Sequence, residues 1–413
     1  MKIAVVNVWG SNRGDEAMIS SLLCHLESRR HDVELHVRGW LDVDRFNVKI
    51  LPWITEQKIS KNKLVRWITF KANYYFGKQL FKIMSRNLLR NYQDSKTFDY
   101  DFVISSPAGP YFGDMYPATE HKCLLPLHIC NTKNIPYGIL AVSCGPFTGK
   151  RWNKIRENTF EKAVFWTVRE NISYDYLDKL NLKCEKYAGS DLVFAHPYRE
   201  TNSFLPDNLK DDYMEQMSKF ETPTIIIVLN QTGYFTAEGA NIPFDINAYG
   251  IKMGEFLSYV QEVAKCKLVI FSHFYGNKIE IKNIENVIKN SKCSKYISVL
   301  NPKYNAEMQM SLYKKAVFCV SHRYHPTIFS IKARCPFFCI KHQFKADGLL
   351  QRFGDDIANI HTYDSLSDWK VAFKKSWDTR EGLKKAIDKH LVDYNSESVK
   401  HLNILDKYIN RNI

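Results

Sequence analysis

The chain has 413 residues, enough for two or three domains of ordinary size. Its composition, with 45% hydrophobic and 25% charged residues, is that of a globular protein and excludes a chain that is disordered throughout. The ten cysteines are scattered singly and never form a CxxC pair, which favours reduced buried thiols over a disulfide framework. A net charge of +14 predicts attraction to an anionic partner or substrate.

The first residues form a short strand-like run that is too short for the apolar core of a signal peptide. No apolar stretch reaches the roughly 18 residues that a membrane-spanning helix needs. We therefore expect a cytoplasmic protein.

Short β-branched runs alternate with longer helical patterns along the whole chain, which is typical of parallel sheets with crossover helices. The runs predict strands at residues 3–8, 33–37, 101–105, 137–142, 163–168, 192–194, 224–229, 267–271, 296–299, 316–320 and 336–340. Helical periodicity is clear at residues 17–26, 251–264, 305–315 and 327–333.

A basic segment interrupts the first half of the chain at residues 57–93, which contain nine Lys or Arg and no acidic residue. Aromatic and aliphatic residues recur there at a spacing of three and four, as on one face of a helix. Such a basic amphipathic helix suits peripheral contact with the inner face of a membrane, and the alternative is that the stripe packs on its own domain.

The strand pattern predicts an α/β protein with two doubly wound, Rossmann-like domains that face a cleft, an architecture resembling GT-B glycosyltransferases. We place the N-terminal domain at residues 1–200, a polar linker at 201–223, the C-terminal domain at 224–365 and a helical tail at 366–413. Ligands of such sheets bind at the carboxyl ends of the strands, where each candidate motif lies.

The first motif, Asn12-Arg13-Gly14-Asp15-Glu16, connects a strand to a helix. Gly14 permits a tight turn, and the free N–H groups of the helix start suit an anion or a hydroxyl-rich ligand. The glycine spacing is not that of a dinucleotide site. The alternative is that Asp15 and Glu16 only complement the helix dipole.

The second motif is the glycine- and proline-rich loop at residues 109–114, which ends in Asp114. Its carboxylate could orient sugar hydroxyls or act as a base, and the alternative is a carboxylate that caps a turn. The third motif begins with Arg169 directly after a predicted buried strand. Arg169 either binds a carboxylate or phosphate, or pairs with Glu170 or Asp191.

The fourth motif is Ser321-His322-Arg323-Tyr324-His325, followed by Pro326 at the predicted first position of a helix. Cationic side chains at a strand end and helix start favour an anionic ligand, and His325 is the candidate for proton transfer. Cys319 lies close to both histidines, but the spacing matches no zinc pattern, so we predict no metal.

These motifs, in this order and spacing, resemble those of the polysaccharide pyruvyl transferase family over roughly residues 1–345. Members transfer the enolpyruvyl group of phosphoenolpyruvate to two sugar hydroxyls, which forms a pyruvate ketal and releases phosphate. The resemblance implies that His325 is the general acid and base and that Arg169, Arg323 and Ser321 bind phosphoenolpyruvate.

The same resemblance places the acceptor on the side of the N-terminal domain and the donor on the side of the C-terminal domain. Asp114 would act on the acceptor there, and the remaining acceptor-binding residues would be Asn12, Gly14, Asp15 and Glu16. The acceptor would be a cell-surface glycan, such as a capsule or exopolysaccharide, or its lipid-linked precursor. The donor is a substrate, so no cofactor is expected, and no nucleic-acid partner is predicted.

Two alternatives remain open from the sequence. A GT-B glycosyltransferase would use a nucleotide sugar and need a ribose- or diphosphate-binding carboxylate, for which Glu280 is the candidate. A non-catalytic protein that binds polyanions would account for the net charge of +14.

Overall fold

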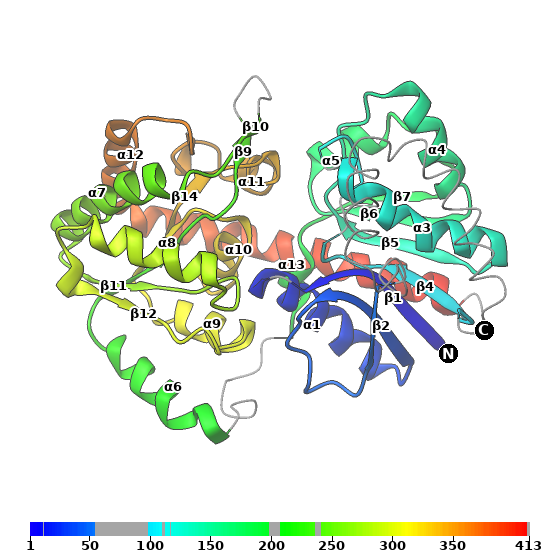
Figure 1. The fold of residues 1–413 in the computed structure, drawn as a ribbon, viewed down its shortest axis with the longest axis horizontal. Helices are drawn as coiled ribbons and strands as arrows, with labels where there is room; N and C mark the ends of the chain where they lie inside the picture. Colours follow the sequence, from blue (N-terminus) through cyan, green and yellow to red (C-terminus); the bar gives the residue numbers. More distant parts are fainter. Residues whose placement is uncertain are drawn as a thin grey trace, which may run out of the picture. The chain divides into compact units, whose positions relative to one another are not determined.

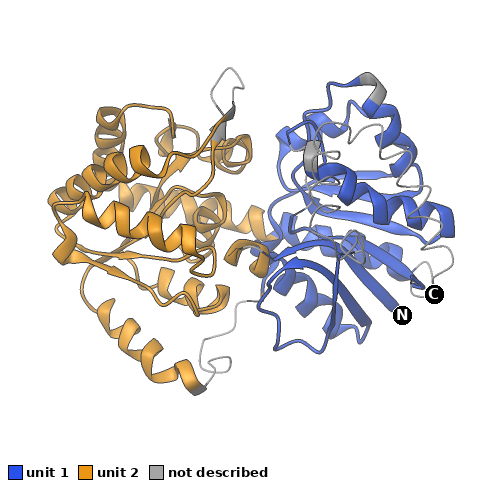
Figure 2. Cartoon of the chain, viewed as in Figure 1, with its two compact units in different colours: residues 1–11, 18–196, 396–413 blue, residues 12–17, 197–395 orange. Residues whose placement is uncertain are grey.

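The computed structural model describes most of the chain in two compact units (Figure 2). The described residues are 1–10, 12–53, 98–109, 112–115, 117–197, 207–235 and 241–410. Unit 1 comprises residues 1–11, 18–196 and 396–413, and unit 2 comprises residues 12–17 and 197–395. The basic segment 57–93 lies outside the described residues, so its predicted helix and membrane contact stay predictions.

Unit 1 is built on a seven-stranded sheet in the order β3-β2-β1-β4-β5-β6-β7, in which every neighbouring pair is parallel (Figure 1). Its strands are β1 (Lys2–Gly10), β2 (Asp32–Gly39), β3 (Lys49–Pro52), β4 (Phe102–Ser105), β5 (Tyr137–Val142), β6 (Ala163–Val168) and β7 (Glu185–Ala188). Its helices are α1 (Arg13–Ser28), whose first turn belongs to unit 2, α3 (Pro117–Lys133), α4 (Lys150–Phe160), α5 (Asn171–Leu177) and the 3-10 helix η2 (Leu192–Ala195).

Unit 2 contains a six-stranded parallel sheet in the order β12-β11-β8-β13-β14-β15 and a short antiparallel pair of strands (Figure 1). Its strands are β8 (Thr224–Val228), β9 (Tyr234–Phe235), β10 (Asn241–Ile242), β11 (Lys267–Ile270), β12 (Ile297–Val299), β13 (Phe318–Ser321), β14 (Phe337–Lys341) and β15 (Ile360–His361). Its helices are α6 (Asp207–Lys219), α7 (Ile246–Ala264), α8 (Lys278–Lys289), η4 (Ser294–Tyr296), α9 (Ala306–Tyr313), α10 (Tyr324–Lys332), α11 (Phe344–Leu350), η5 (Gln351–Asp356), α12 (Leu366–Asp378) and most of α13 (Arg380–Asn410) up to residue 395.

Central strands of both sheets are buried on both faces, as crossover helices require. All residues of β5 and β8 are buried, and neither strand alternates between exposed and buried positions. Continuous apolar runs of this kind are the signature of parallel sheets covered on both sides. The predicted α/β fold with two parallel sheets is therefore confirmed.

The predicted strand at residues 192–194 is wrong, because this segment forms the 3-10 helix η2. The Asp191 carboxylate accepts a hydrogen bond from the Val193 N–H and caps the turn. A capping aspartate turns the backbone before a strand can pair, and this local effect outweighs the β-propensity of the apolar run.

The segments predicted as a polar linker and a helical tail both contain helices. Residues 207–219 of the predicted linker form helix α6. The predicted tail consists of α12 and α13, and residues 396–413 belong to unit 1. There the Ser398 hydroxyl donates to the Asp191 carbonyl at 2.9 Å, and His401 Nε2 lies 2.9 Å from the Ser190 carbonyl oxygen.

A buried ion pair joins α3 to α4 in unit 1. Arg156 and Glu120 are both fully buried, and Arg156 Nε and Nη2 each donate to the Glu120 carboxylate at 2.8 Å. The same carboxylate accepts from the Gly113 N–H at 2.8 Å and from the Trp152 indole at 2.5 Å. Glu120 thus holds the loop that carries Asp114 against both helices.

Replacing Arg156 with methionine should destabilise unit 1, because the buried Glu120 carboxylate loses its cation. Breaking a buried pair by removing one partner costs about 3–5 kcal/mol. Urea unfolding followed by tryptophan fluorescence measures the loss, and exposed Lys154 on the same helix provides the matched control. Lys154→Met should change stability by less than about 0.5 kcal/mol. Equal midpoints for the two variants would contradict a structural role for this pair.

Candidate active site

The turn between β13 and α10 presents Arg323 and His325 at the carboxyl edge of the unit 2 sheet. Arg323 is the N-cap of α10 and has extended backbone angles, so the helix begins at Tyr324. Pro326 is therefore the third residue of the helix and not the first, as the sequence predicted. Its missing N–H costs nothing there, because the N–H groups of the first turn have no partner within the helix.

Ser321 and Thr327 fix the shape of this turn. The Ser321 hydroxyl, which is fully buried, donates to the Arg323 carbonyl at 2.7 Å. The Thr327 hydroxyl donates to the same carbonyl at 2.9 Å. The described contacts of Ser321 thus stabilise the turn itself, and its binding of substrate stays a prediction.

The His325 ring lies directly against the backbone of Gly14, and both residues belong to unit 2. A Cβ atom built on Gly14 would lie 2.1 Å from both Cγ and Nδ1 of the ring. No side chain fits into this space, which accounts for glycine at position 14. The structure thereby brings together two motifs that lie more than half the chain apart in sequence.

The motif around Gly14 is held in unit 2 by its own polar side chains. Asn12 Oδ1 accepts from the N–H groups of Gly14 at 2.9 Å and Asp15 at 3.0 Å, as an N-cap does. The fully buried Glu16 carboxylate accepts from Arg13 Nη1 at 2.5 Å and from the Ala306 N–H at 2.8 Å. Glu16 therefore has the contacts of an anchor for the helix start, and Asp15 is also buried.

His273, which follows the end of β11, lies beside His325. Its ring is stacked on that of His325, with centroids 6.4 Å apart and planes inclined by 26°. The His273 carbonyl accepts from the Arg13 N–H at 2.9 Å. Burial, and then the positive charges of Arg323 and Arg13, hold the pKa of His273 well below its usual value. The neighbour of His325 is thus a neutral imidazole.

Glu280 holds the loop after β11 by hydrogen bonds. It is the candidate for the carboxylate that a glycosyltransferase would use to bind a nucleotide sugar. Glu280 accepts from the N–H groups of His273 at 2.7 Å and of Phe274 and Gly276, both at 2.9 Å, and from the Ser272 hydroxyl. Both carboxylate oxygens are engaged by the protein's own loop, and the residue is buried. These contacts give Glu280 a structural role and do not favour contact with a nucleotide.

Arg323 packs on an aromatic ring, whereas His322 is hydrogen-bonded in the core of unit 2. The Arg323 guanidinium lies over the Phe274 ring, with Cζ 3.7 Å from the ring centroid. His322 is fully buried, with Nε2 2.7 Å from Thr362 Oγ1 and Nδ1 3.2 Å from the Tyr249 hydroxyl. Burial, followed by the charges of Lys252 and Arg323, lowers the pKa of His322 to about 3. His322 is therefore a neutral hydrogen-bonded core residue at physiological pH.

Asp114 belongs to unit 1, and both its oxygens are engaged. Arg156 Nη2 donates to one oxygen at 2.8 Å, and the Thr148 N–H and hydroxyl donate to the other at 2.6 and 2.7 Å. Burial alone would raise the pKa of Asp114, but the bonds from Thr148 and Arg156 outweigh it and lower the pKa. A general base works best with a pKa near the working pH, so these contacts disfavour Asp114 as a base.

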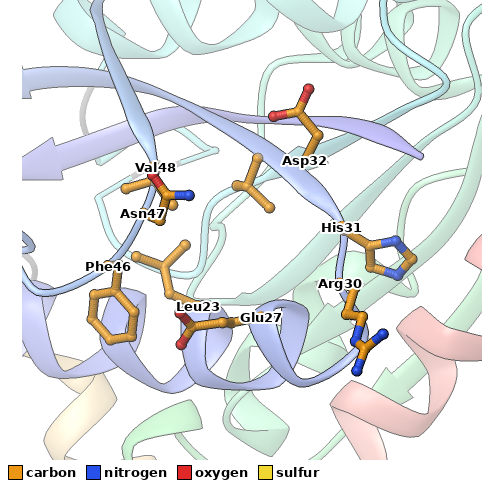
Figure 3. A pocket seen from close by; sticks show the side chains of 9 residues that line it. Leu23, Glu27, Arg30, His31, Asp32, Phe46, Asn47 and Val48 are labelled. Carbon is orange, nitrogen blue, oxygen red and sulfur yellow. The ribbon is translucent and has the colours of Figure 1, made fainter.

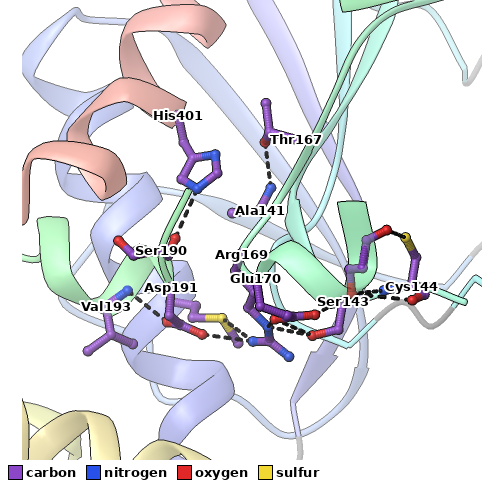
Figure 4. A network of polar contacts seen from close by, with 12 residues as sticks. Ala141, Ser143, Cys144, Thr167, Arg169, Glu170, Ser190, Asp191, Val193 and His401 are labelled. Atoms are coloured by element: carbon purple, nitrogen blue, oxygen red, sulfur yellow. Dashed lines mark hydrogen bonds and ion pairs between the residues drawn. The ribbon is translucent and has the colours of Figure 1, made fainter. Parts of the chain in front are cut away.

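Arg169 also belongs to unit 1 and lies in a network of buried polar groups (Figure 4). Its Nη1 donates to the Asp191 carboxylate at 2.8 Å, and its Nε donates to the Ser143 hydroxyl at 2.8 Å. The Glu170 carboxylate lies 3.7 Å from the same Nε. The ion pairs expected of a structural arginine are therefore present, and binding of an anionic substrate by Arg169 stays a prediction.

A pocket in unit 1 with a volume of about 430 Å³ lies elsewhere (Figure 3). It is lined by the end of α1 and by residues around the start of β2, among them Glu27, Arg30 and Asp32. Since β2 begins at Asp32, this pocket is at the amino end of the strand. The candidate motifs all follow the carboxyl ends of strands, so the pocket is not part of the candidate active site.

His273 was missed in the sequence, although it follows a predicted strand just as His325 does. Since its position after a strand made His325 a candidate, His273 could have been identified in the same way. Among the residues that the structure describes, no group of three His, Cys, Asp or Glu side chains could hold a metal ion. In the same residues, no helix combines the length and apolar character needed to cross a bilayer.

Part of the chain is similar in sequence to a curated protein. The amylovoran biosynthesis protein AmsJ of Erwinia amylovora is 24% identical over 213 residues, which cover 47% of this chain and 49% of AmsJ. The match thus spans about half the length of that curated relative. It links the chain to a protein of polysaccharide biosynthesis without covering the whole of it.

Solved structures show the fold. The UDP-GlcNAc 2-epimerase of Neisseria meningitidis bound to UDP-GlcNAc has a TM-score of 0.62 at 13% identity, covering 98% of this chain and 100% of that one. TcCGT1 in complex with UDP has a TM-score of 0.60 at 10% identity, covering 100% and 99%. At these identities the likeness concerns the fold, which is the GT-B-like pair of Rossmann-like domains.

The family is shown by the sequence of most of the chain. Residues 12–343 match the family described as Polysaccharide pyruvyl transferase. This range includes the turn at Gly14 and the turn at His325, which the structure brings into contact. The chain belongs to the polysaccharide pyruvyl transferase family.

Proposed function

We propose that the protein transfers the enolpyruvyl group of phosphoenolpyruvate to two hydroxyls of a sugar in a cell-surface glycan or its precursor. Family membership supports this reaction class. The observation that carries the proposal is the packing of the His325 ring on Gly14 at the carboxyl edge of the unit 2 sheet. Ligands bind at this edge in doubly wound folds.

The reaction needs one group that can both give and take a proton. Protonation of the methylene carbon of phosphoenolpyruvate makes a methyl group and leaves C2 electrophilic. One sugar oxygen adds to C2, and a second displaces phosphate as the bond between C2 and the phosphate oxygen breaks. Of the two hydroxyl protons, one balances the proton given to the methyl group and the other leaves with phosphate. An imidazole can perform both transfers near neutral pH, and we assign them to His325.

The charges of the donor require cationic side chains near His325. Arg323, two residues before His325, is proposed to bind an anionic group of phosphoenolpyruvate in the bidentate manner of a guanidinium. Arg169 is proposed as a second residue that binds the donor. Its ion pair with Asp191 is the structural alternative to this role. Asp114 is proposed to orient an acceptor hydroxyl as a carboxylate, in keeping with its lowered pKa.

The direct test is to incubate the purified protein with phosphoenolpyruvate and a panel of glycan and lipid-linked acceptors. The expected products are inorganic phosphate and a pyruvate ketal on the acceptor, detected by phosphate assay and mass spectrometry. Release of a nucleoside diphosphate from a nucleotide sugar, without consumption of phosphoenolpyruvate, would support a glycosyltransferase instead.

His325→Ala should reduce turnover by about 10²–10⁴-fold, the usual contribution of general acid–base catalysis. Phosphoenolpyruvate binding, measured by calorimetry, should change little, because the binding charges remain. The half-buried His128 on α3 of unit 1 supplies the control, and His128→Ala should keep normal turnover. Near-normal turnover of His325→Ala would rule out the proposed role.

Gly14→Ala should lower kcat by up to about 100-fold, because the new methyl group displaces the His325 ring and small misplacements are costly in catalysis. Gly382 on α13 is the matched control, since a Cβ there meets nothing within 4 Å. Gly382→Ala should retain activity and gain about 0.5–1 kcal/mol of stability. If both variants keep full activity, the packing of His325 on Gly14 has no catalytic importance.

Arg323→Ala should weaken phosphoenolpyruvate binding by about 1.5–3 kcal/mol, the value of a hydrogen bond to a charged group. Arg169→Ala should do the same and also lower the melting temperature, because the buried Asp191 and Glu170 lose their cation. Calorimetry and thermal unfolding separate the two effects. A loss of stability with unchanged binding would leave Arg169 a purely structural residue.

A further inference from the structure

A second strand–helix turn lies beside the turn that carries Arg323 and His325. Strands β13 and β14 are neighbouring parallel strands, with Val320 opposite Phe338 and Ser321 opposite Cys339. The turn after β14 therefore leaves the same edge of the sheet, about 5 Å away. His342 follows β14 directly and Lys345 lies in the first turn of α11, and neither belongs to the motifs identified in the sequence.

Lys345 is a buried lysine close to the proposed catalytic histidine. The residue is 8% exposed, and its Nζ lies 5.4 Å from the centroid of the Tyr324 ring. The Tyr324 ring in turn contacts the His325 ring, with centroids 5.2 Å apart and planes inclined by 73°. The ammonium group is thus one aromatic ring away from the imidazole to which proton transfer is assigned.

His342 lies within the electrostatic reach of both cations. It is 6% exposed, and its Nδ1 is buried without a hydrogen-bond partner among the described residues. Burial, then Lys345, then Arg323 and His322, hold the pKa of His342 well below its usual value. One neutral imidazole therefore lies close enough to Lys345 and Arg323 for both charges to lower its pKa.

Lys341, the last residue of β14, is the matched control for Lys345. It is also buried, at 6% exposure, and its ammonium group is bonded to the side chains of Asp347 and Asn359. Its charge is matched by a carboxylate on helix α11. Lys341 therefore provides a comparison of equal burial and nearly equal position in the chain.

We propose that Lys345 binds the phosphate group of the donor substrate, while Arg323 binds its carboxylate. This inference rests on the proposed pyruvyl transfer and adds Lys345 to Arg323 and Arg169 as a third cationic residue that binds the donor. The division follows from side-chain chemistry, since a planar guanidinium matches a carboxylate and an ammonium group binds phosphate as a point charge. Phosphate would then leave from Lys345, whose ammonium group lies near the same Tyr324 ring that the His325 ring contacts.

The test compares Lys345→Met, Lys345→Arg and Lys341→Met in the full chain, with the wild type as reference. Calorimetry measures the binding of inorganic phosphate alone, and steady-state assays measure KM for phosphoenolpyruvate and kcat. Lys345→Met should weaken phosphate binding and raise KM by roughly 10- to 100-fold, as expected for loss of one charged hydrogen bond. The value of kcat should change far less, Lys345→Arg should recover part of the binding, and Lys341→Met should bind phosphate normally.

Unchanged phosphate binding in Lys345→Met would overturn the inference, as would an equal loss in Lys341→Met. A fall in kcat with unchanged KM would make Lys345 a residue that positions Tyr324 and His325, and would also overturn it. These results are distinguishable from failure of the proposed function. If the wild type binds phosphate through Lys345 but transfers no pyruvyl group, the anion site stands and the reaction is wrong.

Discussion

The close approach of the His325 ring to the Gly14 backbone is the constraint on which the candidate active site depends. It requires a residue without a side chain at the start of α1, and it requires that start to be held in place. Asn12 holds it by capping the helix, and Glu16 holds it by accepting from Arg13 and from the backbone N–H of Ala306. The residues that the sequence assigned to the acceptor thus take part in positioning the proposed acid and base.

Buried carboxylates play a common part in both units. Glu16, Glu120, Glu280 and Asp191 are each at least 96% buried, and each accepts hydrogen bonds from backbone N–H groups of a loop or helix start. A buried carboxylate is stable only when such donors surround it. The acidic groups near the strand ends therefore shape loops through hydrogen bonds to backbone N–H groups.

Much of the fold follows from the sequence, because apolar runs such as residues 137–142 and 163–168 favour buried parallel strands. Both ranges match the observed strands β5 and β6. The error at residues 192–194 arose where one capping side chain decided the backbone. The motifs at Gly14 and His325 could be found in the sequence, but their contact could not, since no local pattern reports a distance between residues 14 and 325. The pairing of Arg169 was foreseen only as an alternative, because an arginine after a strand suits a ligand and a carboxylate equally well.

The assignment of residues 12–17 to unit 2 means that this unit is not a continuous piece of the chain. A fragment that begins at residue 197 would contain the whole six-stranded sheet and yet lack the backbone on which the His325 ring rests. The buried edge of that ring would then meet solvent. Separate expression or swapping of this unit between relatives would therefore have to carry the short N-terminal segment with it, through a linker or a circular permutation that joins it to the rest.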